Sequence, residues 1–173
     1  MAGLQRRIGA PECLILIGAL MFIAMLWLSA VYDPTIRWLH FFQAWMYIAA
    51  IVLALRTSRW GYFIGISIGM FWIYACTFVS TFFRSGLIHL GRWMQGLDFR
   101  ADQILAVPAW TGNLLIVIGC LWAYGRMRPK ATSDVTRLVV AFALSTAFLW
   151  TDIALFQPRY LAMFTGLLHP HAP

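Results

Sequence analysis

One aspartate stands inside a long apolar stretch near the C-terminal end of the chain, and its position makes it the strongest candidate for chemistry. Asp152 falls within the apolar run 138–156. A carboxylate in such a run is costly in lipid unless it is paired, hydrated or protonated, so it is by default a functional candidate. Its candidate partners are His40, Arg84 and Arg159, and a His–Asp pair could relay protons or anchor a polar head group.

Other polar residues repeat at helical spacing in the neighbouring apolar runs. Three of them, His40, Gln43 and Tyr47, are spaced i, i+3, i+7 and therefore share one face of a helix. The alternative interpretation is structural, because serine and threonine in membrane helices often bond to a neighbouring turn, and Asp152 lies close enough to the end of its run to meet interfacial water. The candidate ligand site comprises Asp152, His40, Gln43, Tyr74, Thr77 and Asn113.

Haem and quinone are the cofactors that such a site could hold, and the sequence identifies neither. A b-type haem needs axial ligands at matching depth on facing helices, and only His40 of the four histidines falls securely within an apolar run. No CxxC pair or clustered ligand spacing predicts a metal site, and His169 and His171 belong to a tail that we expect to fray. Phosphate-loop, dinucleotide and nucleophile-elbow motifs are also missing from the sequence, so no enzyme class is indicated.

Glycines at a spacing of four residues mark a helix face that another helix could approach closely. Gly61, Gly65 and Gly69 form G-x-x-x-G-x-x-x-G, and Gly112 and Gly119 mark a similar groove in a later run. Missing side chains let helix backbones come close together, which is a main source of attraction between helices in lipid. We expect these faces to pack within the bundle, with docking of a partner subunit or a second copy as the alternative.

The composition requires that these residues lie in helices that cross a membrane. Of 173 residues, 62 % are hydrophobic and 11 % are charged, against roughly 45–50 % and about 25 % in soluble domains. A bilayer core about 30 Å thick needs about 20 apolar residues in a helix, and its backbone must be satisfied within its own segment. We therefore predict an all-α membrane bundle, a single domain over 1–173, with spans at 13–31, 36–55, 60–83, 104–124 and 138–156.

Basic residues flanking the spans predict the orientation. With the N-terminus inside, eight basic residues lie on the inner side and five on the outer side, so the positive-inside rule favours N-inside and C-outside. Asp152 and His40 then fall at nearly the same depth, about 6 Å below the outer edge at about 1.5 Å per residue. The first run could instead be a cleaved signal peptide, but its apolar stretch is longer than the usual 7–15 residues.

Two amphipathic stretches outside the spans predict one or two short helices on the outer surface. The segment 84–97 places Leu87, Leu90 and Trp93 on one helical face, a pattern typical of a helix lying flat on the membrane. The tail 160–168 has a similar pattern. Either element could cap the polar residues of the outer half.

The sequence favours a non-catalytic function, an accessory or scaffolding subunit of a membrane complex. Small size, short loops and missing motifs motivate this expectation, with membrane lipid and other membrane subunits, or self-association, as partners. The alternative is an outer-side ligand or redox site for quinone, lipid or haem, centred on Asp152 and His40. The high net charge of +7 needs no nucleic acid, because arginines facing an anionic leaflet account for it. Twelve arginines against one lysine are typical of a GC-rich bacterial genome, so we expect a bacterial inner-membrane protein.

Overall fold

The computed structural model describes residues 8–166, and within that range all regular secondary structure is helical. Five long helices form the bundle, and each is continuous enough to satisfy its own backbone. The arginines Arg6 and Arg7, which contributed to the expected orientation, and the tail residues His169 and His171 lie outside the described residues. The long helices are α1 (Ala10–Tyr32), α2 (Arg37–Leu55), α3 (Arg59–Tyr74), α6 (Ala106–Arg126) and α7 (Ser133–Phe156).

The prediction of an all-helical bundle with five membrane-length helices is confirmed. Five helical segments are long and apolar enough to cross a membrane, judged by length and composition. Among the five helices, α7 differs most from its predicted start, because it begins at Ser133 and the prediction placed the start at 138. Four of the residues 133–137 are polar or charged, so hydropathy excludes this segment, although nothing prevents the helix from continuing beyond the apolar stretch.

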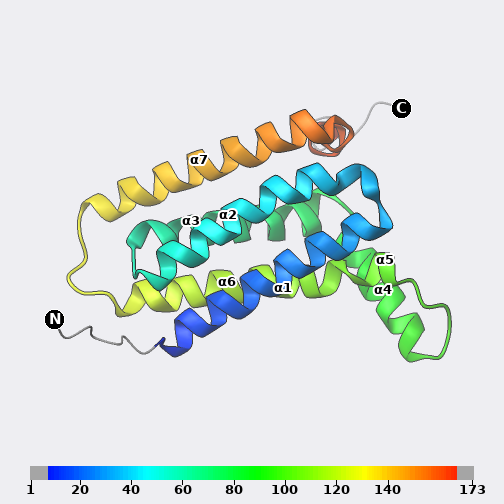
Figure 1. The fold of residues 1–173 in the computed structure, drawn as a ribbon, viewed down its shortest axis with the longest axis horizontal. Coiled ribbons are helices and arrows are strands. Elements are labelled where there is room, and N and C mark those ends of the chain that lie inside the picture. The colour runs from blue at the N-terminus through cyan, green and yellow to red at the C-terminus, as the bar shows by residue number, and fades with distance from the viewer. Residues whose placement is uncertain (1–7, 167–173) are drawn as a thin grey trace.

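The helices run side by side with alternating direction (Figure 1). Helix α1 packs broadly against α6 and also against α2, while α3 lies against α2, α6 and α7. Helix α7 forms one side of the bundle on α3 and α2. The turns 33–36, 80–105 and 157–160 therefore gather at one end of the bundle, which we call the cavity end, and the connections 56–58 and 127–132 gather at the opposite end.

The glycine faces are used for close packing inside the bundle. A Cβ added at Gly61 would meet Leu53 and Ala54 of α2 at 2.5–2.7 Å, and one added at Gly65 would meet the Cys120 sulfur of α6 at 2.6 Å. Gly69 faces Val117 and Asn113 of α6, and Gly119 faces Pro11 and Ile15 of α1. The chain's own helices therefore cover these faces.

A second close helix approach involves a glycine that the sequence pattern did not single out. A Cβ added at Gly18 of α1 would lie 2.5 Å from the carbonyl oxygen of Gly112, and one at Gly112 would lie 2.7 Å from the carbonyl oxygen of Gly18. The two backbones are thus in contact across the α1–α6 interface. Gly18 has no glycine four residues away, so no repeat marks it in the sequence.

The third predicted span, 60–83, extends four residues too far, because the helical segment ends at Val79. Helix α3 ends at Tyr74 and is followed by one turn of π-helix, η2 (Ala75–Val79), closed by a hydrogen bond from Ser80 N to Ala75 O. Ser80 then adopts an extended backbone, and its hydroxyl accepts a hydrogen bond from Phe82 N at 3.4 Å. This side chain offers the backbone an alternative to the helix.

The chain next forms the amphipathic helix α4 (Phe82–Met94), as the sequence predicted. Its end is a Schellman motif with Gly96 at φ 75°, where Leu97 N bonds to Arg92 O and Gly96 N bonds to Trp93 O. Only Gly86 of α4 is buried, against the short helix α5 (Ala101–Ile104) and the start of α6. Most of the apolar surface of α4 is therefore exposed.

The predicted tail helix also forms, but it packs back onto the bundle. The turn η3 (Pro158–Tyr160) leads into α8 (Leu161–Gly166). The ring of Phe164 lies 4.9 Å from that of Trp150 and 6.0 Å from that of Phe71, measured between centroids. Helix α8 consequently becomes part of the cavity end.

The opposite end is held by Asp134, a residue to which the sequence assigned no role. Its carboxylate accepts hydrogen bonds from Arg59 at 3.0 Å, from Arg137 at 3.3 Å and from the Tyr124 hydroxyl at 3.1 Å. The Asp134 side chain is only 4 % exposed. One buried carboxylate thus links α3, α6 and α7.

Candidate functional site

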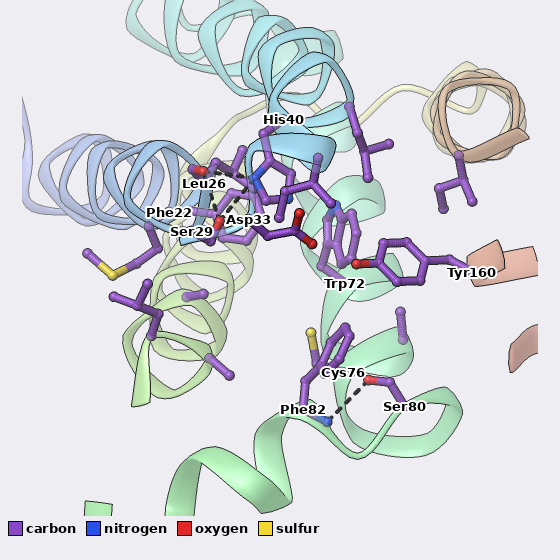
Figure 2. A pocket seen from close by; sticks show the side chains of 18 of the residues that line it. Phe22, Leu26, Ser29, Asp33, His40, Trp72, Cys76, Ser80, Phe82 and Tyr160 are labelled. Carbon is purple, nitrogen blue, oxygen red and sulfur yellow. Dashed lines mark hydrogen bonds between the residues drawn. The ribbon is translucent and has the colours of Figure 1, made fainter. Parts of the chain in front are cut away.

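A cavity of about 400 Å³ opens at the cavity end of the bundle. Its walls come from α1, α2, α3 with its π-turn, the start of α6, and α8, so residues far apart in the sequence surround one space (Figure 2). The inner wall is apolar, and polar groups gather toward the loops. The apolar side chains include Phe22, Leu26, Leu39, Trp72, Ile153 and Phe164, and the polar ones include Ser29, Asp33, His40, Ser80, Asp102 and Gln103.

His40 is the candidate site residue that lies in the cavity wall. Its Nδ1 atom lies 2.8 Å from the carbonyl oxygen of Leu26 and 3.0 Å from the hydroxyl of Ser29, both on α1. The Ser29 hydroxyl itself donates to the Leu26 carbonyl at 2.8 Å. Because a carbonyl oxygen can only accept, Nδ1 must carry the proton, and the ring is fixed in one orientation between α1 and α2 (Figure 2).

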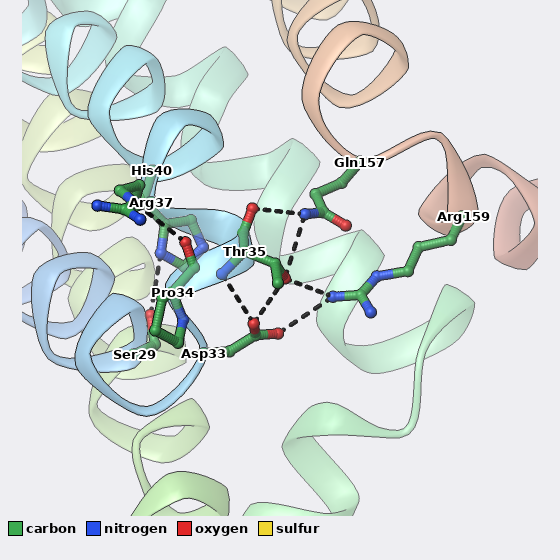
Figure 3. Close-up of polar contacts among 8 residues, drawn as sticks. All are labelled: Ser29, Asp33, Pro34, Thr35, Arg37, His40, Gln157 and Arg159. Carbon is green, nitrogen blue, oxygen red and sulfur yellow. Dashed lines mark hydrogen bonds and ion pairs between the residues drawn. The ribbon is translucent and has the colours of Figure 1, made fainter.

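A polar network lies at the loop side of the cavity, where it links residues 33–35 to Gln157 and Arg159 (Figure 3). The Asp33 carboxylate accepts from the backbone N–H and the hydroxyl of Thr35, at 3.0 and 2.6 Å, which caps the short helix η1 (Pro34–Ile36). Arg159 donates to Asp33 at 3.1 Å, and Gln157 donates to the Thr35 carbonyl at 2.7 Å. The α1–α2 turn is therefore fastened to the end of α7.

This network lowers the pKa of the Asp33 carboxyl below its ordinary value. The hydrogen bond from the Thr35 hydroxyl is the main cause, partial desolvation opposes it, and the Thr35 backbone N–H and Arg159 add to the lowering. Asp33 therefore stays ionised and paired at neutral pH. Arg159 was expected as a partner of Asp152, and the structure places it on Asp33 instead.

The expected pairing of Asp152 with His40 is not formed. Asp152 is buried on α7, and neither of its carboxylate oxygens has a hydrogen-bond partner among the described residues. It does not line the cavity, although its neighbour Ile153 does. Residue counts predicted that Asp152 and His40 lie at the same depth along the membrane normal. Contact also requires that the two side chains point toward each other from their helices. His40 faces α1, whereas α7 packs on α2 and α3.

Gln43 and Ser145 share this unpaired state with Asp152. The amide of Gln43 is fully buried on α2, and the hydroxyl of Ser145 is buried on α7. Neither has a hydrogen-bond partner among the residues that the structure describes. The helices α2 and α7 pack against each other and against α3, and these buried polar groups do not line the cavity.

The other predicted site residues also serve contacts away from the cavity. Asn113 accepts a hydrogen bond from the Tyr47 hydroxyl at 2.7 Å and donates to the Ala109 carbonyl at 2.9 Å, which links α2 to α6 in the core. Thr77 accepts from the indole N–H of Trp110 at 3.0 Å. Tyr74 is half exposed on the outside of the bundle. Of the six predicted ligand residues, only His40 lines the cavity.

Sequence reasoning missed most of the polar cavity wall. Ser29, Asp33, Asp102 and Gln103 lie in or next to connections, where polar residues are ordinary and carry no helical spacing. Asp33 precedes Pro34 in a turn, where an aspartate is an ordinary residue. The available signal was the clustering of polar residues at one end of several helices, and the cavity opens at that same end.

The described residues contain no group of three histidines, cysteines or carboxylates that could hold a metal ion. The free cysteines Cys13, Cys76 and Cys120 are separate, and Cys76 lies in the cavity wall. The geometry provides a shaped apolar space with a fixed imidazole at its wall. Comparisons with protein-family models, with curated proteins and with solved structures find no match for this chain.

Proposed function

We propose that this chain is a small integral membrane protein that binds an amphipathic molecule in the cavity between α1, α2, α3 and α6. The observation that supports the proposal is the cavity itself, about 400 Å³ with an apolar interior and polar groups at the loop side. This volume lies within the range of about 300–1,000 Å³ that is usual for small-molecule sites. An apolar tail would lie against Phe22, Leu26 and Leu39, with its head toward His40 and Asp33.

The basic connections support an N-inside orientation, with the cavity facing the outer side of a bacterial inner membrane. Arg126, Arg128, Lys130 and Arg137 lie at the end opposite to the cavity, where the positive-inside rule predicts the cytoplasm. Reporter domains fused after Phe156 and within 127–132 test this orientation. The proposal requires an external signal for the first fusion and a cytoplasmic signal for the second.

Exposed apolar residues on α4 support contact with the membrane surface at the same end. Leu87, Ile88, Trp93 and Met94 are each at least 46 % exposed. A helix with such a face is stable when it lies at the boundary between head groups and acyl chains. We propose that α4 borders the lipid from which the ligand enters.

A role as an accessory subunit receives less support from the contacts. The glycine faces that could have docked a partner are covered by α1, α2 and α6. A scaffolding function would have to use the lipid-facing residues of the long helices. Co-purification of a partner that is independent of the cavity would favour that second candidate.

The experiment that tests the proposed function fills the cavity without changing the fold. Ala109 lines the cavity on α6, and Ala109→Phe would place a ring in that space. The matched control is Ala143→Phe, at an exposed position on α7. Both proteins are purified gently and analysed by native mass spectrometry and by a visible spectrum.

We expect a small molecule to accompany the wild type and Ala143→Phe and to be lost from Ala109→Phe. A Soret band in the visible spectrum would identify the ligand as haem. The proposal is refuted if no small molecule binds to the wild type, or if Ala109→Phe retains it at the wild-type level.

A further inference from the structure

We infer that the ligand of this cavity carries a free hydroxyl group in its head and that His40 recognises it. This inference rests on the proposed function and adds the chemical class of the ligand. The cavity shape by itself accepts any amphipathic molecule of suitable size. The hydrogen-bonding state of its wall is more selective.

The first step is the tautomer of His40. The Nδ1–H donates to the Leu26 carbonyl and faces the Ser29 oxygen, whose own proton is used by the same carbonyl. In the uncharged ring, which the apolar wall favours, Nε2 then carries a lone pair and can only accept. Nε2 makes no hydrogen bond with the residues that the structure describes.

The second step is an unmet donor in the same wall. The indole N–H of Trp72 is buried and has no hydrogen-bond partner among the described residues. Both Trp72 and His40 line the cavity (Figure 2). The wall therefore offers the His40 acceptor, and the buried Trp72 N–H lies without a partner in a residue that lines the same cavity.

The third step concerns Asp33 and Ser29, two other polar residues of the cavity wall that already have hydrogen-bond partners. The Asp33 carboxylate already receives hydrogen bonds from Thr35 and Arg159. The Ser29 hydroxyl donates to Leu26. The His40 acceptor and the Trp72 donor, in contrast, have no hydrogen-bond partner among the described residues.

A hydroxyl complements the His40 acceptor, because it donates one hydrogen bond and can also accept others. A carbonyl or an ether oxygen could accept from Trp72 but would leave His40 Nε2 facing an acceptor. The two membrane sources of such a head are a quinol and a glycerolipid with a free hydroxyl, such as diacylglycerol. No proton or electron transfer is required for this recognition.

The experiment compares hydroxyl probes with their ethers on the full-length protein in an amine oxide detergent, which lacks hydroxyl groups. The probes are a decyl hydroquinone, its dimethyl ether, dioctanoylglycerol and the methyl ether of dioctanoylglycerol. Binding is measured by quenching of tryptophan fluorescence and by native mass spectrometry. We expect at least one hydroxyl probe to bind about 10-fold or more tightly than its ether, because a buried hydrogen bond is lost.

Two variants separate recognition by His40 from simple steric exclusion of the ethers. His40→Asn can keep a donor to the Leu26 carbonyl but has no acceptor at the Nε2 position, so the preference for hydroxyl probes should disappear. His40→Gln can place its amide oxygen near that position and should retain part of the preference. Thermal unfolding of both variants verifies that they are folded.

The outcomes also distinguish this inference from the proposed function. Preference for the quinol or for the glycerolipid identifies the source, and either result supports the inference. Equal binding of hydroxyl and ether probes in the wild type overturns the inference and leaves the cavity function standing. A preference that persists in His40→Asn overturns it as well. Binding of no probe, together with the absence of a co-purified molecule, refutes the proposed function itself.

Discussion

Substitution of Gly112 by alanine tests whether the contact between α1 and α6 holds the bundle together. The added Cβ would lie 2.7 Å from the carbonyl oxygen of Gly18 and 3.3 Å from the backbone nitrogen of Phe22. Both neighbours are backbone atoms, which cannot rotate away as a side chain can. The helices would have to separate locally by roughly 0.7 Å to restore an ordinary contact distance, and a gap of that size forfeits a quarter to a half of each dispersion contact.

The expected cost follows from two opposing effects. Forcing an extra carbon into a packed interface costs typically about 1–3 kcal/mol, whereas replacing glycine by alanine in a helix gains up to about 1 kcal/mol. The matched control is Gly125→Ala in the last turns of the same helix, where nothing lies within 4 Å of the added Cβ. We therefore expect Gly112→Ala to be less stable than Gly125→Ala by about 1–3 kcal/mol.

The assay is reversible unfolding in mixed micelles, followed by circular dichroism while the fraction of denaturing detergent is raised. Both variants are compared with the wild type at the same protein and total detergent concentrations. Equal stability of Gly112→Ala and Gly125→Ala would refute the close α1–α6 contact. A more stable Gly112→Ala would refute it more strongly.

Three further predictions concern the polar contacts. Tyr47→Phe leaves the buried Asn113 carbonyl oxygen without its donor, so unfolding should become easier by about 1 kcal/mol. Asp134→Asn loses the charge that Arg59 pairs with and should lower the melting temperature. The lowered pKa of Asp33 means that its contribution to stability is present above pH 3.8 and is lost as the pH falls through the lowered value, so thermal melts at pH 6 and pH 3 should differ.

The controls for these three predictions use the same unfolding assays. Tyr74→Phe removes a hydroxyl from a half-exposed tyrosine and should leave stability unchanged. Asp102→Asn changes a carboxylate in a connection and should affect stability less than Asp134→Asn. In Asp33→Asn the loss of stability between pH 6 and pH 3 should shrink, and an unchanged loss would show that other carboxylates cause it.

Asp152 illustrates what the sequence could and could not predict. Hydropathy located five membrane-length helices, because burial in lipid leaves a long and unambiguous apolar signal. Residue counting also placed Asp152 and His40 near the same end. It could not predict which side of each helix faces its neighbour, because that depends on the orientation of α2 about its own axis between α1 and α7. The carboxylate therefore lies in a helix interface, and the imidazole lies in the cavity.

The glycines show the same division between local and long-range information. The repeat around Gly65 predicted a close helix contact, since the spacing of its glycines is a local pattern within one helix. The partner could not be predicted from that repeat, and an equally close approach uses Gly18, which has no glycine repeat around it. The π-turn after Tyr74 was likewise hidden in a continuous apolar run, where Ser80 was the only local sign of the break.

The contact between Gly18 and Gly112 has a consequence for how the protein is made. Helices α2, α3 and α4 are synthesised between these two residues, so α1 enters the bilayer long before α6 exists. Insertion of single helices precedes their association in lipid. The Gly18 side of α1 therefore has no packing partner while the hairpin of α2 and α3 assembles beside it. Ribosome-bound intermediates that stop before Ala106 should therefore expose that side of α1 to cross-linking, and longer intermediates should protect it.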